Sequence, residues 1–305
     1  MSASASGCAI CVDHITKSYG DFVAVNDLSF EVRRGEIFSM LGPNGAGKTT
    51  TIRMILDILK PDTGTIQVLG GQISEKTKER IGYLPEERGL YRNVPVIDVL
   101  VYLGQLKGMS SKEARERATA MLEQVDLGDN IKSKVSELSK GMQQKVQIIA
   151  TVLHRPDLII IDEPFSGLDP VNTQLIKDML YQMNKDGVTI VMSTHQMPQI
   201  EEMADRLLMI DRGRQVLYGS VQEVRERFAQ NAVVIEGEGN WAALPGVTAV
   251  EAADSGREVV LRLAEGVTPD DIMHAVAVGQ DYHVRRFELA VPSLNDIFIR
   301  VVEGQ

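Results

Sequence analysis

The stretch EIFSMLGPNGAGKTTTIRMILDIL, residues 36–59, decides how the chain folds around it. Its first six residues predict a short buried strand, and apolar residues at helical spacing from Lys48 onward predict a helix. Between the two, Gly42, Gly47, Lys48 and Thr49 occupy the fixed places of the pattern G-x-x-x-x-G-K-[ST]. An ordinary glycine-rich turn is the alternative, but the strand before the loop and the helix after it favour a phosphate-binding loop.

The chemistry expected of this loop follows from its residue types. Glycines allow a tight turn in which successive N–H groups point at phosphate, and the following helix contributes its positive N-terminal end. We expect Lys48 to reach the β- and γ-phosphates of a nucleotide and the hydroxyl of Thr49 to bind Mg²⁺.

Two further segments end apolar strands with polar side chains. In LIIIDEP, residues 158–164, Asp162 can hold Mg²⁺ and Glu163 can polarise a water against the γ-phosphate. An Asp-Glu pair after a strand is otherwise a solvated end or a helix cap, so this interpretation depends on the phosphate loop. His195 closes the strand VMSTH at the same sheet edge and can also reach the γ-phosphate, although a lone histidine is more often structural.

The order of the expected elements predicts an α/β fold around a mostly parallel sheet. Nearly all-apolar strands at 157–162 and 188–194 alternate with helices at 139–154 and 171–187, which is typical of strands buried on both faces. Between residues 96 and 138 the helical spacing predicts a helical insertion. Further strands are expected at 9–15, 23–32 and 64–70.

Composition and charge suggest where the chain divides. It has 305 residues, 44% of them apolar, and a net charge of −10, which argues against a protein that binds nucleic acid through clustered Lys and Arg. After Gln230 there are 12 Asp and Glu against 5 Arg and no Lys, so we expect a domain boundary there. The expected parts are a flexible tail at 1–8, a main domain at 9–230 with its helical part at about 95–138, and an acidic accessory domain at 231–305.

The accessory domain is expected to be a small α+β unit, for which a ferredoxin-like topology is one candidate. Its strands are predicted at 232–237, 247–252, 258–263 and 282–291, its helices at 269–278 and 293–302, and a turn at 254–256.

Cys8 and Cys11 form a C-x-x-C pair near the start of the chain. A thioredoxin-like site needs such a pair at a helix start and a zinc site needs two further ligands, and neither context is present. We therefore expect two reduced structural cysteines. The chain has no charged segment followed by an apolar stretch at its start and no run near about 18 apolar residues, so we expect a soluble protein.

The segment LSKGMQQK, residues 138–145, adds a second potential anion site, because Ser139 is a good N-cap and Gly141 leaves the backbone bare. Alone it would be an ordinary capped helix. Together with GPNGAGKTT, LIIIDEPFSGLD and STH in this order, it makes residues 9–228 closely resemble the nucleotide-binding subunit of ATP-binding cassette (ABC) transporters. The resemblance implies an ATPase with a P-loop NTPase core, an antiparallel β subdomain and a helical insertion.

The resemblance also implies roles for individual residues. The catalytic residues would be Lys48, Glu163 and His195, the last as the switch histidine. Ser139, Gly141 and Gln143 would form the signature that reaches the γ-phosphate of an ATP held by the opposite chain, and Asp169 would lie at the dimer interface. The nucleotide would be bound by Tyr19, Gly42, Pro43, Asn44, Gly45, Ala46, Gly47, Lys48, Thr49 and Thr50. Tyr19 would stack on adenine, whereas from the residue alone it could be a core or turn tyrosine.

These roles imply a head-to-tail dimer, homomeric or heteromeric, that closes on two ATP and reopens after hydrolysis. A chain of this kind needs a separate integral-membrane permease, and it would lie in the cytoplasm against the inner face of the membrane. The ending VPSLNDIFIRVV is similar to the extra domain of bacterial sodium-extrusion and drug-export ATPase subunits, which implies a brace that lengthens the dimer interface or a regulatory or substrate-linked role.

The segment IGYLPEERGLY, residues 81–91, departs from the family pattern. At the position of Glu86 the family carries a glutamine that touches Mg²⁺ and the attacking water. A carboxylate can still coordinate Mg²⁺ but adds a negative charge near the phosphates. We therefore expect Glu86 to engage the site as a metal ligand only with Mg²⁺ present, and Glu87 and Arg88 to be solvated or to face a partner.

Two other functions fit the sequence less well than a bacterial exporter ATPase that uses ATP and Mg²⁺. Soluble ABC ATPases of translation or DNA repair usually carry two cassettes, a long coiled-coil insertion or basic surfaces, and the sequence has none of these. A phosphate-loop kinase or GTPase would leave LSKGMQQ and SGLD unexplained. We expect no nucleic-acid partner.

Overall fold

The computed structural model describes residues 7–86, 89–229, 231–252, 258–279 and 281–302. The chain separates into two compact units, Met1–Val221 and Gln222–Gln305. Glu87, Arg88 and the turn expected at 254–256 lie outside the described residues. Within the described part, none of the helices combines the length and apolar character that crossing a membrane would require.

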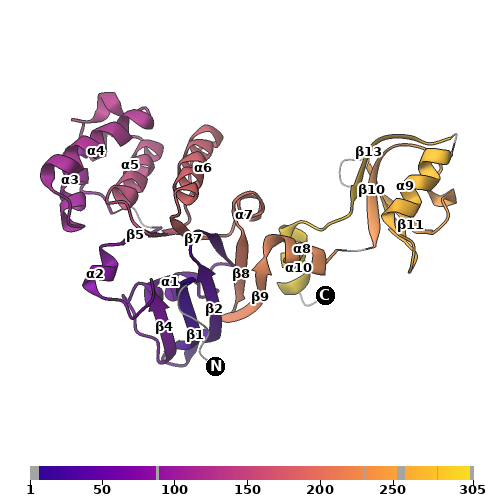
Figure 1. Ribbon diagram of the computed structural model, residues 1–305, viewed down its shortest axis with the longest axis horizontal. Helices are drawn as coiled ribbons and strands as arrows, with labels where there is room; N and C mark the ends of the chain where they lie inside the picture. Colours follow the sequence, from indigo (N-terminus) through magenta and orange to yellow (C-terminus); the bar gives the residue numbers. More distant parts are fainter. Residues whose placement is uncertain (1–6, 87–88, 230, 253–257, 280, 303–305) are drawn as a thin grey trace. The chain divides into compact units, whose positions relative to one another are not determined.

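A six-stranded sheet forms the centre of the first unit (Figure 1). Its strand order is β5-β6-β7-β3-β8-β9, in which the first five strands are parallel and β9 is antiparallel to β8. The strands are β5 (Ile81–Leu84), β6 (Leu158–Asp162), β7 (Thr189–Thr194), β3 (Ile37–Leu41), β8 (Arg206–Asp211) and β9 (Arg214–Ser220). The expected mostly parallel core is confirmed, while β8 and β9 were not predicted.

Two hydrophobic cores lie on the two faces of this sheet. Alternate residues of β6 divide between them, with Ile159 and Ile161 in one core and Leu158 and Ile160 in the other. Every residue of β3, β6 and β7 is buried, because both faces of these strands are covered. Figure 1 shows α5 and α6 on one side of the central strands and α1 with the smaller sheet on the other.

The helices expected in the first unit occur in the expected order with differences at their ends, and two short helices, Glu75–Lys78 and Met197–Met203, were not expected. They are α1 (Lys48–Ile55), α2 (Glu75–Lys78), α3 (Val96–Leu106), α4 (Ser111–Gln124), α5 (Lys140–Val152), α6 (Pro170–Lys185) and α7 (Met197–Met203), with 3-10 turns at Gly128–Asn130 and Val135–Glu137. α1 ends four residues before the expected residue 59, because the backbone turns at Asp57 with a φ of 59°. The helical insertion is confirmed as α3 and α4, whose buried residues share one core with α5.

The smaller sheet of the first unit is antiparallel, with strand order β2-β1-β4. Its strands are β1 (Cys8–Tyr19), β2 (Phe22–Arg33) and β4 (Thr63–Val68). The expectation of two reduced cysteines is wrong in this structure, because a disulfide joins Cys8 and Cys11 within β1. A register shift between Cys8 and Ile10 interrupts the extended strand and brings the two Cα atoms to 6.2 Å, within the usual span of a disulfide.

The second unit contains a four-stranded antiparallel sheet of order β11-β12-β10-β13. Its elements are β10 (Ala232–Glu238), a 3-10 turn at Trp241–Ala243, β11 (Val247–Ala252), β12 (Glu258–Leu263), α9 (Pro269–Val278) and β13 (His283–Leu289), flanked by α8 (Val221–Arg227) and α10 (Leu294–Val302). The strand order is that of a ferredoxin-like fold with the 3-10 turn in place of the first helix. Trp241 and Ile272 cover the inner face of the sheet.

Candidate functional site

The phosphate loop connects β3 to α1 and requires glycine at defined positions. Gly42 has a φ of 150° and Gly47 a φ of 108°. A Cβ on Gly42 would lie 2.1 Å from the carbonyl oxygen of Ile210, and one on Gly47 would lie 2.5 Å from that of Ala24. Gly47 caps α1 without a side-chain hydrogen bond, so no side chain of the cap competes for the N–H groups at this end of the helix.

Lys48 points back along the loop. Its Nζ donates hydrogen bonds to the carbonyl oxygens of Gly42 at 2.7 Å and Pro43 at 3.2 Å, and the side chain is buried. Burial lowers the pKa of the Lys48 amine, while the negative charges of Glu163, Asp162 and Glu86 act in the opposite direction. The amine therefore lies among three carboxylates from two other segments of the chain.

Asp162 is the last residue of β6 and is fixed by two hydroxyl groups. The Thr49 hydroxyl donates to its Oδ2 at 3.1 Å, and the Ser193 hydroxyl donates to its Oδ1. The residue is 3% exposed, so its carboxylate is held at the bottom of the site, next to the first turn of α1.

Glu163 follows directly and takes the left-handed conformation, with a φ of 53°. This turn of the chain directs its carboxylate toward the end of β7. There its Oε1 accepts a hydrogen bond from the His195 backbone N–H at 3.1 Å and pairs with His195 Nδ1 at 2.7 Å, and its Oε2 accepts from the Thr194 hydroxyl at 3.2 Å. Such strain at a single residue is typical of functional sites.

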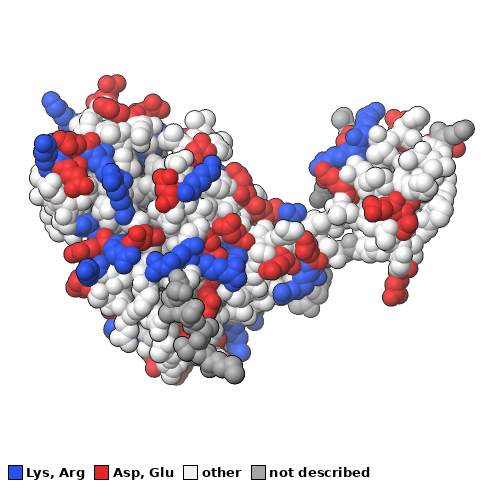
Figure 2. All heavy atoms as spheres, viewed as in Figure 1, with Lys and Arg blue, Asp and Glu red and all other residues white. Residues whose placement is uncertain are grey.

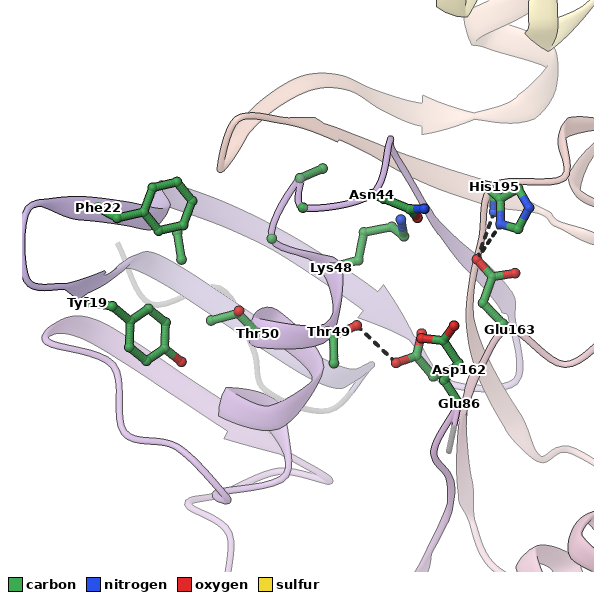
Figure 3. Close-up of a pocket in the computed structure, with 14 residues that line it drawn as sticks. Tyr19, Phe22, Asn44, Lys48, Thr49, Thr50, Glu86, Asp162, Glu163 and His195 are labelled. Atoms are coloured by element: carbon green, nitrogen blue, oxygen red, sulfur yellow. Dashed lines mark hydrogen bonds and ion pairs between the residues drawn. The ribbon is translucent and has the colours of Figure 1, made fainter. Parts of the chain in front are cut away.

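One pocket of about 550 Å³ brings together most of the predicted site residues (Figure 3). Its described lining consists of Tyr19, Phe22, Ala24, residues 44–50, Glu86, Asp162, Glu163 and His195. Gly42 and Pro43 are not in this lining, but their carbonyl oxygens hold Lys48. Phe22 and Ala24 were missed, although Phe22 stands beside Tyr19 across the short turn SYGDF.

The predicted signature residues do not line this pocket. Ser139 is exposed and caps α5 by accepting from Met142 N, while Gln143 Nε2 donates to the carbonyl oxygens of Val135 and Leu138. Gly141 also lies outside the pocket lining, next to the side chain of Asn172.

Asp169 is exposed and caps α6. Hydrogen bonds from the Asn172 backbone and side chain hold the pKa of Asp169 below its ordinary value. Within one chain, the signature residues and Asp169 are therefore absent from the described lining of the nucleotide pocket.

The donor set suits a hard cation, because Thr49, Asp162 and Glu86 all offer oxygen atoms to one side of the pocket. Among the described residues, however, no group of three or more His, Cys, Asp or Glu side chains is arranged to hold a metal ion by itself. A Mg²⁺ ion here would therefore share its coordination with phosphate oxygens and water, as this ion does in other phosphate sites.

Comparison with known proteins agrees with this geometry. Residues 25–166 match the family model described as "ABC transporter", and residues 219–302 match "ATP-binding protein DrrA1-3-like, C-terminal domain". The chain is 41% identical to an uncharacterized ABC transporter ATP-binding protein of Bacillus subtilis, YhaQ, over 96% of this chain and 98% of that protein. The chain belongs to the ATP-binding subunits of ABC transporters.

Two further relatives extend the comparison of this ABC subunit. It is 39% identical to the Nod factor export ATP-binding protein I of Paraburkholderia xenovorans, over 70% of this chain and 71% of that protein. A solved structure described as an ATP-binding subunit of an ABC transporter superposes with a TM-score of 0.68 at 31% identity, over 72% of this chain and 93% of that one. As a member of this family the protein binds and hydrolyses ATP, and such subunits dimerise and work with membrane permeases.

Proposed function

We propose that this ABC subunit powers a bacterial exporter by closing head to tail on two ATP. The observation that carries the proposal is that, within one chain, the signature residues lie apart from the nucleotide pocket. The pocket holds Lys48, Asp162, Glu163 and His195, while Ser139 lies exposed outside it. A second copy that supplies Ser139, Gly141 and Gln143 would complete each site, and Asp169 would lie where the copies meet. The name of the Nod factor export relative supports export as the direction of transport.

The residues of the pocket suggest how hydrolysis proceeds. The loop amides of residues 44–50 and Lys48 would bind the phosphates, and Tyr19, 49% exposed at the pocket, would stack on adenine. Glu163 would accept the proton of the attacking water, and His195, bonded to its Oε1, would hold that carboxylate in place. Mg²⁺ bound by Thr49, Asp162 and Glu86 would neutralise charge on the phosphates.

The permease contact is proposed at an apolar groove beside the loop that follows β5. This groove has a volume of about 380 Å³, and its lining includes Tyr83, Leu90, Leu103, Leu106, Gln147 and His154. Leu106 is 62% exposed, and Tyr91 and Tyr102 stack edge to face on the surface at 5.7 Å between ring centroids. An apolar groove of this kind suits a helix of a partner protein. The subunit would then lie in the cytoplasm, held at the inner membrane face by the permease.

A nucleic-acid partner is not part of the proposal. The chain carries a net charge of −10, and Figure 2 shows Lys and Arg interspersed with Asp and Glu on the face drawn. Phosphate backbones are instead bound by clustered cations. Purification of the subunit from cells should therefore recover an integral membrane protein, whereas recovery of nucleic acid alone would contradict the transport assignment.

Mixing two inactive variants tests the shared sites. Lys48→Ala disables the pocket of its own chain, and Ser139→Arg disables the site to which that chain contributes its signature. In a mixed homodimer one of the two sites is then intact, so the mixture should recover about a quarter of the wild-type ATPase rate. If each chain used its own Ser139, both sites would be defective in every dimer and mixing would restore nothing.

Glu86→Gln tests the proposed metal contact. The substitution removes a negative charge from the pocket and should change both the Mg²⁺ dependence and the rate of ATP hydrolysis. If both quantities stayed unchanged, Glu86 would not be a metal ligand, while the rest of the proposal would stand.

A further inference from the structure

A small cavity shares its three carboxylates with the nucleotide pocket. We call it the rear cavity; its volume is about 30 Å³. Its described lining consists of Leu84, Pro85, Glu86, Gln144, Gln147, Asp162, Glu163 and Ser166. Glu86, Asp162 and Glu163 line both the rear cavity and the nucleotide pocket, so a group held in the rear cavity can contact carboxylates that also line the nucleotide pocket.

Two glutamines of α5 reach this cavity, and they differ in what they bind. Gln144 is 5% exposed, and its Nε2 donates to the carbonyl oxygen of Pro164 at 2.6 Å. Gln147, one turn further along, is 6% exposed, and its side chain has no hydrogen-bond partner among the described residues. Gln147 also lines the apolar groove, and its amide atoms are not among the fully buried atoms that lack a partner, so the amide can hydrogen-bond a water in either space.

The size and lining of the rear cavity define which group it can hold. A space of this volume holds one water molecule, and a buried water needs two to four polar partners. The Gln147 amide can donate to such a water, and the carboxylates of Glu86 and Glu163 can accept from it. A water is preferred over an anion because three of the lining side chains are carboxylates.

We propose that Gln147 is a positioning residue for Glu86, which it holds in place through one water in the rear cavity. The proposal rests on the function proposed for Glu86 as a metal ligand and extends it. Glu86 stands in a loop rather than in a strand or helix, and its side chain is exposed. A bridge from the rigid helix α5 fixes its carboxylate beside Asp162, as an outer partner does for other metal-binding carboxylates.

The position of Gln147 also connects this bridge to the surface. Gln147, Leu84 and Pro85 line both the rear cavity and the apolar groove proposed for the permease. A segment that fills the groove therefore contacts the same glutamine that positions Glu86. Occupancy of the groove can in this way change the metal site without any contact with the nucleotide.

Gln147→Met tests the bridge because it keeps the size of the side chain and removes the amide. Crystal structures of the wild type should show a water within about 3 Å of both the Gln147 amide and the Glu86 carboxylate. In Gln147→Met this water should be absent and Glu86 should be displaced. A wild-type structure without the water, or an unmoved Glu86 in the variant, would refute the proposal.

Kinetics supply a second readout through a double-mutant cycle. Gln147→Met should raise the Mg²⁺ concentration for half-maximal ATP hydrolysis about ten-fold, the effect of one hydrogen bond to a charged group. In a Glu86→Gln background the same substitution should change it by less than about two-fold. An equal effect in both backgrounds would mean that Gln147 acts on packing and not through Glu86.

Thr151→Val is the matched control, since Thr151 lies one turn further along α5 and lines the groove but is not in the lining of the rear cavity. It should leave the Mg²⁺ dependence and the position of Glu86 unchanged. If Glu86→Gln alone had no effect on Mg²⁺ dependence, the metal role proposed for Glu86 would fail, and the crystal structures would still decide whether Gln147 positions Glu86.

Discussion

Lowering the pH from 7.5 to 5.0 should destabilise the first unit by about 2 kcal/mol through a single residue, His154. The side chain lies at the end of the apolar groove. Its Nε2 faces the carbonyl oxygen of Ile81 at 3.2 Å and must donate to it, which leaves Nδ1 bare, and that buried nitrogen has no partner. Burial, helped by the positive charge of Lys107, lowers the pKa of His154 from 6.5 to about 4.

The sign and size of the effect follow from these two values. In the unfolded chain His154 takes up a proton as the pH falls through 6.5, whereas in the folded chain it does so only near pH 4. The stability that depends on a neutral His154 is therefore retained above pH 6.5 and is lost as the pH falls toward 4. One pKa unit corresponds to about 1.36 kcal/mol, so the loss reaches about 2 kcal/mol at pH 5.0 and about 3 kcal/mol below pH 4.

Urea unfolding at pH 7.5 and pH 5.0 measures this loss. Circular dichroism follows both units, while fluorescence of Trp241, the one tryptophan of the chain, follows the second unit and identifies its transition. His154→Gln keeps a donor for the carbonyl of Ile81 but cannot be protonated. The first unit of the wild type should lose about 2 kcal/mol more than that of the variant. Equal losses in both would refute the assignment to His154.

Three other substitutions give separate outcomes. Glu163→Gln removes the proton acceptor and keeps the side-chain volume, so it should lower kcat of ATP hydrolysis by about 10²- to 10⁴-fold. ATP binding, measured by calorimetry, should be retained, and weak ATP binding would argue against this role. Lys48→Ala should instead weaken ATP binding, since the one lysine of the described pocket lining is lost, and an unchanged Kd would contradict its phosphate contact. Trp241→Ala should destabilise the second unit by about 3–5 kcal/mol in urea, seen by circular dichroism, and leave the first unit's transition in place; a shift of both would refute independent cores.

The central sheet could be predicted because its strands are buried on both faces. In β6 and β7 nearly every residue is apolar, so the sequence carries the signal without an amphipathic pattern. The same signal was present in RLLMID of β8, and the turn at Arg212 and Gly213, with φ values of 46° and 75°, marks the hairpin to β9. The hairpin was missed because alternation of strands and helices, on which the prediction relied, stops at this point.

A site residue could be predicted only where a side chain of suitable chemistry stands in a recognisable sequence motif. Asp162 and Glu163 end a recognisable strand, and Lys48 follows a recognisable loop. Gln147 has no such signal, because a polar residue within a helix indicates a solvated face unless tertiary contacts bury it. Its place at the rear cavity depends on how α5 packs against the sheet, which local sequence does not encode.

The charge of the pocket gives Glu86 its significance. Three carboxylates, Glu86, Asp162 and Glu163, line it, whereas Lys48 is the single lysine or arginine in the described lining. Two unit charges at 4 Å interact by about 4 kcal/mol at an effective dielectric constant of 20, so each carboxylate opposes the entry of a polyphosphate unless a cation is present. A glutamine at position 86 would leave two carboxylates, whereas the glutamate adds a third. ATP and Mg²⁺ are therefore expected to enter together, so that the loop carrying Glu86 responds to the metal-bound nucleotide rather than to nucleotide alone.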